Sequence, residues 1–349
     1  MTYLMVAGGL VLLLIGGEVL VRGAVTLAQR LSVPPLVIGL TVVACGTSSP
    51  ELVVSLDAML SDAPEIAVGN VVGSNIANIL LVLGLPAIIF PIVCDVKAVR
   101  RDGAIMFATS FAFVALCWNG QILNWQGAIM TLLLCGYLTW SYFSGRKENE
   151  ATTEAIVDEI KGIAPRPHSI WHSLALVVVG MASLIIGADL LIAGAMELAI
   201  AAGVSEATIG LSLIALGTSL PELATSLVAA IRRHGDVAIG NVVGSNLFNI
   251  LGIMGITSMV RTVPIPGQIV GYDLWIMVSA AILITPFVLR GRPISRRYGA
   301  FLTTAYLIYI LSLYHGMSGM PKTDLKEAAQ PTPVKHSVEI LSTAAKLLT

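Results

Sequence analysis

The chain contains two copies of one unit, and this duplication limits the possible folds more than any other feature of the sequence. The segment GTSSPE at residues 46–51 returns as GTSLPE at residues 217–222, and GNVVGSN at residues 69–75 returns unchanged at residues 240–246. Both pairs are 171 residues apart. At that offset, 24 of the 45 residues from 36 to 80 are repeated without a gap. Each copy is therefore expected to form the same supersecondary unit.

Apolar segments of membrane-spanning length fill both copies. The chain is 56% hydrophobic and only 12% charged, whereas a soluble domain carries about 25% charged residues. A helix needs about 20 apolar residues to cross a hydrocarbon core of roughly 30 Å. Ten segments suit this role, at residues 3–29, 36–60, 66–91, 102–119, 125–144, 170–200, 207–231, 237–260, 272–289 and 298–316. We therefore expect an all-α integral membrane protein with ten transmembrane helices.

The number of spans in each copy decides how the copies are oriented. Because five is odd, the second copy enters the membrane from the opposite side, which produces the two inverted five-helix repeats of many secondary transporters. The expected organisation is a first repeat, a polar linker, a second repeat and a polar C-terminal tail, at residues 1–144, 145–169, 170–316 and 317–349. The first apolar segment has no basic flank and no small-residue cleavage pattern, which favours a span over a signal peptide.

The basic residues support this alternation. When the loops are assigned to the two sides in turn, 15 of the 20 lysines and arginines fall on the side that holds the linker. Four of the other five lie in the C-terminal tail. Because lysine and arginine concentrate in cytoplasmic loops, we expect a cytoplasmic linker and extracytoplasmic termini. The protein would then be a multi-pass protein of the plasma membrane.

Several other functional classes find no support in the sequence. The formal net charge is −1, so no basic surface indicates a nucleic-acid partner. The four cysteines stand singly in apolar stretches, and no CxxC or histidine-rich spacing indicates a resident metal or another cofactor. No Ser/His or metal-ligand pair stands at matching depth, so we expect no enzymatic activity and no cofactor.

Two glutamates stand inside apolar segments, at equivalent places in the two copies. Glu51 lies about midway through residues 36–60, and Glu222 about midway through residues 207–231. A carboxylate near the centre of a bilayer costs a few kcal/mol, so it usually faces a polar cavity and acts there. Inverted repeats would bring the two glutamates together near the membrane midplane. The alternative is a carboxylate pair that is protonated and buried, or bonded to a serine.

The residues before each glutamate predict a broken helix. Pro50 has no N–H and clashes with the preceding turn, and Gly46 permits an unwound backbone. Such a break would free carbonyl oxygens around residues 44–47, and broken backbone inside a membrane lines a cavity or is buried in protein. Carbonyl, hydroxyl and carboxylate oxygens together suit hard cations such as Na⁺ and Ca²⁺. The second copy supplies the equivalent residues Ala215, Thr218, Ser219 and Glu222.

The repeated GNVVGSN segment adds further polar groups. Ser74 and Asn78 are four residues apart and share a helix face, as do Ser245 and Asn249. Each face can offer a hydroxyl and an amide oxygen to the same cavity. The asparagine within each segment, Asn75 or Asn246, is either a further ligand or a packing hydrogen bond. The four glycines of the two segments, with GxxxG spacing, favour close helix packing.

These paired motifs resemble the α-repeats of the sodium/calcium exchangers, within the cation/Ca²⁺ exchanger superfamily. The prokaryotic calcium/sodium antiporters are the most similar, and the resemblance extends to about residue 316. It implies ten helices, of which the second, third, seventh and eighth form a compact core. The long first and sixth helices are thought to slide past that core to alternate access. It also implies a secondary active antiporter that exchanges Na⁺ for Ca²⁺ across the lipid bilayer, and we expect it to function as a monomer.

The resemblance implies roles for individual residues. The family's Ca²⁺ site falls on Glu51 and Glu222, with oxygens of Thr47 and Thr218. Its flanking Na⁺ sites fall on Ala44, Ser48, Ser74, Ala215, Ser219 and Ser245. Its central position falls on Asn78 and Asn249, where some relatives carry one aspartate. The site here therefore has two formal charges rather than three. The missing charge argues against a proton-accepting group at the centre of the site, and it leaves open whether K⁺ is transported.

Two other transport functions are alternatives. A Ca²⁺/H⁺ antiporter of the same superfamily would show G-N-x-x-E in place of GTSSPE and GTSLPE. A cation channel is an alternative of another class, although inverted repeats around two carboxylates favour a carrier.

Overall fold

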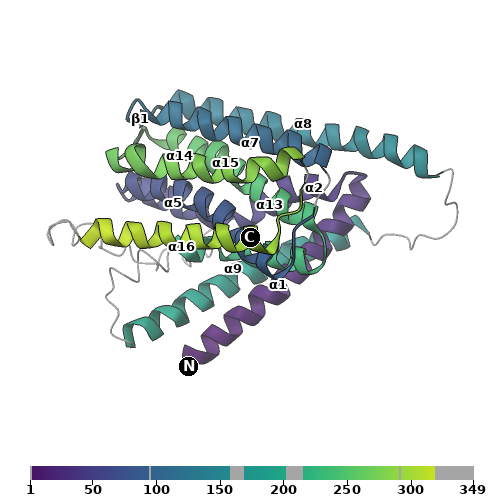
Figure 1. Ribbon diagram of the computed structural model, residues 1–349, viewed down its shortest axis with the longest axis horizontal. Coiled ribbons are helices and arrows are strands. Elements are labelled where there is room, and N and C mark those ends of the chain that lie inside the picture. The colour runs from purple at the N-terminus through teal and green to yellow at the C-terminus, as the bar shows by residue number, and fades with distance from the viewer. Residues whose placement is uncertain (1, 94–95, 158–168, 202–214, 291, 319–349) are drawn as a thin grey trace, which may run out of the picture.

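The computed structural model describes residues 2–93, 96–157, 169–201, 215–290 and 292–318, and this part of the chain is almost entirely helical (Figure 1). Two long helices, α1 (Thr2–Leu31) and α9 (Ile170–Ala201), pack against each other and run obliquely to the others (Figure 1). The remaining helices form a block above this pair, in which α7, α8 and α15 run nearly parallel (Figure 1). Each half of the chain contributes one of the two oblique helices and about half of the block.

The helices of the first copy are interrupted by short π-helical turns. After α1 they are α2 (Pro35–Ile38), the π-turn η1 (Gly39–Val43), α3 (Ala44–Thr47), α4 (Ser49–Leu60), α5 (Pro64–Ala77), the π-turn η2 (Asn78–Val82), α6 (Gly84–Ile89), α7 (Val96–Cys117) and α8 (Asn124–Val157). Proline occupies the first turn of α2, α4 and α5. Its missing N–H is tolerated there because the first N–H groups of a helix have no intrahelical partner.

After α9 the described elements of the second copy are α11 (Ala215–Thr218), α12 (Leu220–Ile231), α13 (Gly235–Leu247), the π-turn η4 (Phe248–Ile253), α14 (Met254–Val260), the π-turn η5 (Ile269–Asp273), α15 (Leu274–Arg290) and α16 (Arg296–Ser318). From α11 to α14 these elements follow the order of α3 to α6, and an additional π-turn, η5, then precedes α15. Both ends of α12 lie 171 residues after those of α4. The turns that follow are also equivalent, since Asp62 and Arg233 both adopt the left-handed backbone, with φ of 57° and 60°. The sequence duplication is therefore a duplication of local structure.

Glycines bring α1 and α9 into backbone contact along their length. The helices run antiparallel, with Gly9 facing Gly187 and Gly16 facing Gly180, while Gly23 packs against Val177 and Gly194 against Val6. A Cβ on Gly16 would lie 2.9 Å from the Leu184 nitrogen, and one on Gly180 would lie 2.6 Å from the Leu20 nitrogen. Small residues permit this close approach, which drives helix association in membranes. The pair can therefore behave as one unit.

The glycines of GNVVGSN differ between the copies. A Cβ on Gly244 would lie 2.4 Å from the Leu40 carbonyl oxygen, and one on Gly240 would lie 2.7 Å from that of Leu36. These two glycines therefore pack α13 against α2 and η1, as GxxxG spacing predicts. Among the described residues nothing lies within 4 Å of a Cβ on Gly69 or Gly73.

The outer helices join in pairs that cross between the copies. Helix α7 packs against α15, α8 against α14, and α16 against α6. Two short antiparallel strands, β1 (Gln121–Ile122) and β2 (Val263–Pro264), connect the copies at one end. Asp273 is buried, and its carboxylate accepts a 2.9 Å hydrogen bond from the Tyr309 hydroxyl. This contact ties η5 to α16.

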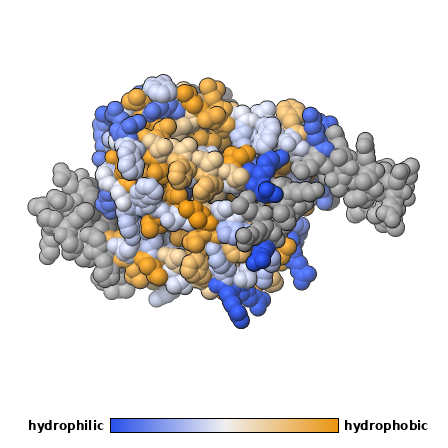
Figure 2. Space-filling view, turned by 45° about the horizontal axis from the view of Figure 1, so that its top comes forward, coloured by the Kyte–Doolittle hydropathy of each residue, from blue (hydrophilic) through white to orange (hydrophobic). Residues whose placement is uncertain are grey.

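The surface and the helix lengths suit a membrane. On the face in Figure 2, apolar residues gather over the middle and hydrophilic residues toward the edges. Large apolar side chains such as Leu132 and Ile308 are 70% and 61% exposed, as expected of groups that face lipid. Among the described residues, helices long and apolar enough to cross a bilayer are Thr2–Leu31, Pro64–Ile89, Ile170–Leu198, Gly235–Val260 and Ile269–Phe287. The bent pair Pro35–Thr47 and Ser49–Leu60 adds a sixth candidate.

Other expected spans are helical but shorter or less apolar, namely α7, α8, α12 and α16. The count of ten inverted transmembrane helices therefore stays a prediction. The expected linker begins inside α8, which continues to Val157, and residues 158–168 lie outside the described part. Most of the expected tail, residues 319–349, also lies outside it.

Candidate cation site

Each glutamate follows a break between two short helices, as the glycine and proline signals predict. Ser48 separates α3 from α4, and the helices on either side are bent by 42°. Ser219 separates α11 from α12 in the same way. The two serines have nearly identical backbones, with φ, ψ of −88°, 9° and −87°, 3°. Because Pro50 and Pro221 have no N–H, the carbonyls of Gly46 and Gly217 lose their usual helical partners.

One expected free carbonyl is bonded. The Ala44 oxygen accepts the Ser48 amide hydrogen at 3.0 Å and lies 3.4 Å from the Thr47 hydroxyl. Only a remaining lone pair of this oxygen could face a cation. Ala215, its equivalent, is the first residue of α11.

The two glutamates are the centre of the candidate site. Glu51 is 1% exposed and Glu222 is 0% exposed. Ser48 of the first copy donates a 2.8 Å hydrogen bond to Glu222 Oε1 of the second. Glu51 lies within electrostatic range of Glu222. The structure thus brings these three expected site residues together, although they are up to 174 residues apart in sequence.

The threonines before the breaks have different environments. Thr47 is buried and donates a 3.2 Å hydrogen bond to Asn241 Oδ1 on α13. It is also within hydrogen-bonding reach of the Glu222 carboxylate. The Thr218 hydroxyl oxygen is buried and has no hydrogen-bond partner within the described part of the chain. The two copies are therefore not in the same local state.

The serine and asparagine of each GNVVGSN segment are buried as well. Ser74, Asn78, Ser245 and Asn249 are at most 3% exposed. Asn78 Nδ2 donates a 3.2 Å bond to Asn246 Oδ1, which joins the two copies at the centre. Asn246 Nδ2 faces the Met106 sulfur at 3.5 Å, and Asn75 Nδ2 donates to the Val71 carbonyl at 2.7 Å. These contacts favour the packing interpretation for Asn246, whereas Asn75 keeps an unpartnered Oδ1, so a ligand role for it stays a prediction.

Many buried oxygens around the glutamates have no hydrogen-bond partner. Across the described residues, the unpartnered oxygens near the breaks and in the equivalent segments are Glu51 Oε2, Glu222 Oε2, Thr218 Oγ1, Ser219 Oγ, Ser245 Oγ, Asn75 Oδ1, Asn78 Oδ1 and Asn249 Oδ1. Buried polar atoms normally have partners, and an unpartnered one costs about 1–3 kcal/mol. A set of carboxylate, hydroxyl and amide oxygens is the donor set of Na⁺ and Ca²⁺. The described residues contain no group of three or more histidine, cysteine or acidic side chains that could hold a metal.

Asn70 and Asn241, which are not among the expected site residues, also contact the helices of the site. Asn70 Nδ2 donates to the Glu51 carbonyl at 3.1 Å and to Ser55 Oγ at 2.9 Å. Asn241 Nδ2 lies 3.3 Å from Ser226 Oγ. A signal was present, because both asparagines and both serines are identical at the 171-residue offset. Each pair fastens a glutamate-bearing helix to the helix that follows it.

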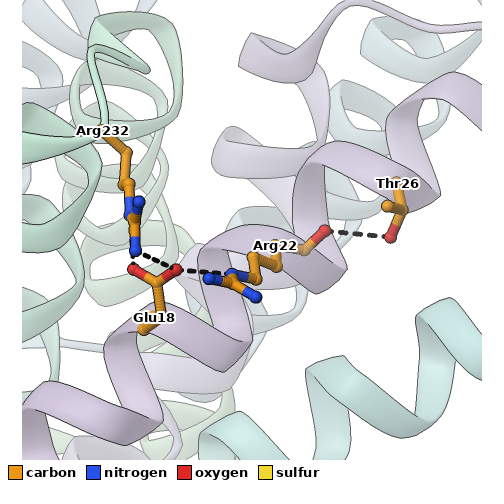
Figure 3. Close-up of polar contacts among 4 residues, drawn as sticks. All are labelled: Glu18, Arg22, Thr26 and Arg232. Atoms are coloured by element: carbon orange, nitrogen blue, oxygen red, sulfur yellow. Dashed lines mark hydrogen bonds and ion pairs between the residues drawn. The ribbon is translucent and has the colours of Figure 1, made fainter.

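The packing around the site is asymmetric. Helix α1 packs along α12, where a Cβ on Gly17 would lie 3.1 Å from the Ala224 carbonyl oxygen. The equivalent helices α9 and α4, both described, have no comparable contact. Beside the α1–α12 contact, Glu18 pairs at 2.5 Å with Arg22, four residues further along α1, and also with Arg232 at 2.6 Å (Figure 3).

Apolar helices, two matching helix breaks and a buried two-carboxylate site define a membrane transporter for cations. A sequence profile of the sodium/calcium exchanger protein family matches residues 1–143 and 172–315. The chain belongs to the sodium/calcium exchanger family. It is thus an exchanger-type antiporter of a multi-pass membrane protein family, as its paired motifs imply.

Individual relatives cover nearly all of the chain. The "Putative antiporter CaxA" of Alkalimonas amylolytica is 33% identical over 88% of this chain and 96% of its own length. The "Sodium/calcium exchanger MaX1" of Methanosarcina acetivorans is 29% identical over 90% of this chain and 98% of its own. A structure of the sodium-calcium exchanger NCX_Mj, soaked without Na⁺ and Ca²⁺, superposes with a TM-score of 0.77 at 33% identity. The superposed region covers 89% of this chain and 98% of the NCX_Mj chain.

Proposed function

We propose that this protein is a secondary active antiporter that exchanges Na⁺ for Ca²⁺ by alternating access. One observation carries the proposal: two fully buried carboxylates from the two copies lie among buried oxygens that have no protein partner. Such a set costs folding free energy unless ions complete it. The choice of Na⁺ and Ca²⁺ is supported by the similar proteins that are named sodium/calcium exchangers.

The ligand set that we propose follows the equivalent positions of the two copies. Glu51, Glu222, Thr47 and Thr218 would hold Ca²⁺. The Na⁺ ligands would be Ala44, Ser48 and Ser74 of the first copy and Ala215, Ser219 and Ser245 of the second, with Asn78 and Asn249 between them. The burial of Glu51 and Glu222 and the Ser48–Glu222 hydrogen bond support this assignment.

The proposed topology has ten transmembrane helices in two inverted repeats, residues 1–144 and 170–316, that act as a monomer. The linker at 145–169 would be cytoplasmic and both termini extracytoplasmic. Matching bounds of α4 and α12 support the duplication, and the excess of basic residues on the linker side supports the orientation. In this orientation α12 forms the inner half of its span, so its contact with α1 closes the cytoplasmic side. The site would then be accessible from outside.

Charge balance provides the coupling between the two ions. One Ca²⁺, or Na⁺ ions, can neutralise the two carboxylates. In the ion-free site the carboxylates would be two like charges in a core without water. Such a pair disfavours ionisation and burial. The empty carrier should therefore change sides slowly, and the loaded carrier should change sides readily. This difference prevents futile cycling and yields exchange.

The test is ⁴⁵Ca²⁺ uptake into proteoliposomes with an imposed Na⁺ gradient. We expect uptake by the wild type, and loss of nearly all of it in Glu51→Gln and Glu222→Gln. Glu65→Gln, at an exposed glutamate of α5, is the matched control and should keep wild-type uptake. Normal uptake by either site variant would refute the assignment of the site.

Two further arms of the same assay separate the alternatives. A pH gradient without Na⁺ that drives Ca²⁺ uptake would indicate a Ca²⁺/H⁺ antiporter. Ca²⁺ flux that neither saturates nor shows counterflow would indicate a channel. Repeating the uptake with and without K⁺ tests whether K⁺ takes part.

A further inference from the structure

We propose that Asn241 is a positioning residue for cation binding, whose Oδ1 accepts the hydrogen bond of the Thr47 hydroxyl and so turns the lone pairs of that oxygen toward the ion. The inference rests on the function proposed above and deepens it. Asn241 is not among the expected ligands, and it acts through one of them.

The geometry fixes the Asn241 amide at both ends. The residue is 0% exposed, on the side of α13 that meets the first copy. Its Oδ1 accepts the Thr47 hydroxyl at 3.2 Å, and its Nδ2 donates to Ser226 Oγ of α12 at 3.3 Å. One side chain thus connects the helix that precedes the Ser48 break to the helix that carries Glu222.

The chemistry of the hydroxyl makes this acceptor important. A threonine hydroxyl has one proton and two lone pairs, and Thr47 is within hydrogen-bonding reach of the Glu222 carboxylate. If its proton pointed to Glu222, it would occupy a carboxylate lone pair that a cation needs. The Ala44 carbonyl, at 3.4 Å, is a poor alternative acceptor. With the proton on the Asn241 side, the Thr47 oxygen and the carboxylate can both face the ion.

The second copy contains the equivalent threonine and asparagine, but without the hydrogen bond between them. Thr218 and Asn70 are the equivalents of Thr47 and Asn241 at the 171-residue offset. Asn70 Nδ2 donates to Ser55, as Asn241 Nδ2 does to the equivalent Ser226. The difference is at the threonine, because the Thr218 hydroxyl oxygen has no partner among the described residues. Because alternating access moves the two inverted repeats against each other, we expect Asn70 Oδ1 to accept the hydrogen bond of the Thr218 hydroxyl in the opposite state. The two amides therefore act alternately.

The test is equilibrium ⁴⁵Ca²⁺ binding to the purified full-length protein, in a double-mutant cycle. Asn241→Leu should weaken Ca²⁺ binding about fivefold, the effect of losing one ordinary hydrogen bond. Asn241→Leu combined with Thr47→Val should bind no more weakly than Thr47→Val alone. Ser226→Ala is the matched comparison, because it removes the other partner of the amide and leaves the Thr47 bond. Its loss of Ca²⁺ binding should be clearly smaller than that of Asn241→Leu.

Two results would overturn the inference. Additive effects in the double variant, or equal losses in Asn241→Leu and Ser226→Ala, would assign Asn241 a purely structural role. If Asn241→Leu is not monodisperse, Asn241→Ser replaces it in the same cycle, with the same expected result. A wild type that binds no Ca²⁺ would overturn the proposed function together with this inference, whereas Ca²⁺ binding with an additive cycle would overturn the inference alone.

Discussion

Replacement of Gly9 by alanine should weaken the packing of α1 against α9, whereas the same replacement at the neighbouring Gly8 should not. A Cβ on Gly9 would lie 2.6 Å from the Leu191 nitrogen and 2.7 Å from the Gly187 carbonyl oxygen. These are backbone atoms, which cannot move aside as a flexible side chain can. Nothing lies within 4 Å of a Cβ on Gly8 in the described part of the chain.

The size of the effect follows from these distances. Ordinary contact begins at 3.4 Å, so the helices must part by roughly 0.8 Å at Gly9, and such overpacking costs about 1–3 kcal/mol. The reciprocal variant Gly187→Ala, whose Cβ would lie 3.0 Å from the Gly9 carbonyl oxygen, should have a smaller effect of the same sign.

The assay is the melting temperature of each variant in detergent, read from the monodisperse fraction after heating. Gly9→Ala should melt below the wild type, and Gly8→Ala should melt at or slightly above it, because alanine favours helix over glycine. Uptake of ⁴⁵Ca²⁺ in proteoliposomes should follow the same order. Equal melting temperatures for Gly8→Ala and Gly9→Ala would refute the backbone contact as a source of stability.

Two further substitutions test other contacts. Arg232→Ala removes one partner of Glu18 at the α1–α12 contact. An exposed ion pair contributes about 0.2–1 kcal/mol, so the fraction of molecules in the inward-facing state should rise by up to about fivefold. Spin-label distances between α1 and α12 measure this fraction, and an unchanged distance distribution would mean that the ion pair has no net effect. Tyr309→Phe leaves buried Asp273 without its 2.9 Å donor and should destabilise the protein by about 1–3 kcal/mol. Tyr306→Phe, on the same helix and similarly buried, should not, and equal melting temperatures would argue against the Asp273 contact.

The local features of the site could be predicted from the sequence. The break before Glu51 follows from Gly46 and Pro50, because these residues act on their own backbone and need no information about the rest of the fold. The pairing of Glu18 with Arg22 follows from helical spacing for the same reason. The internal duplication then transferred the prediction of the break to the second copy, where it recurs at Ser219.

The contacts between the copies could not be predicted in the same way. The bond from Thr47 to Asn241 and the ion pair from Glu18 to Arg232 join residues 194 and 214 positions apart. They depend on how two complete halves dock. The sequence is symmetric at the Thr47 and Thr218 positions, yet their hydrogen bonds differ, because one sequence unit adopts two conformations in one state of the carrier. The number of transmembrane helices is also difficult to predict from hydropathy, because α7, α8 and α16 carry more polar residues than the other long helices.

The backbone contact between α1 and α9 has a consequence for leakage. A carrier with both mouths open at once would act as a pore and dissipate the gradients that it uses. Since glycines hold the backbones of α1 and α9 together, under the alternating access proposed above α9 would approach α4 only by drawing α1 away from α12. Opening of one mouth would then be mechanically tied to closure of the other, and the stiffness of this helix pair would oppose ion leakage.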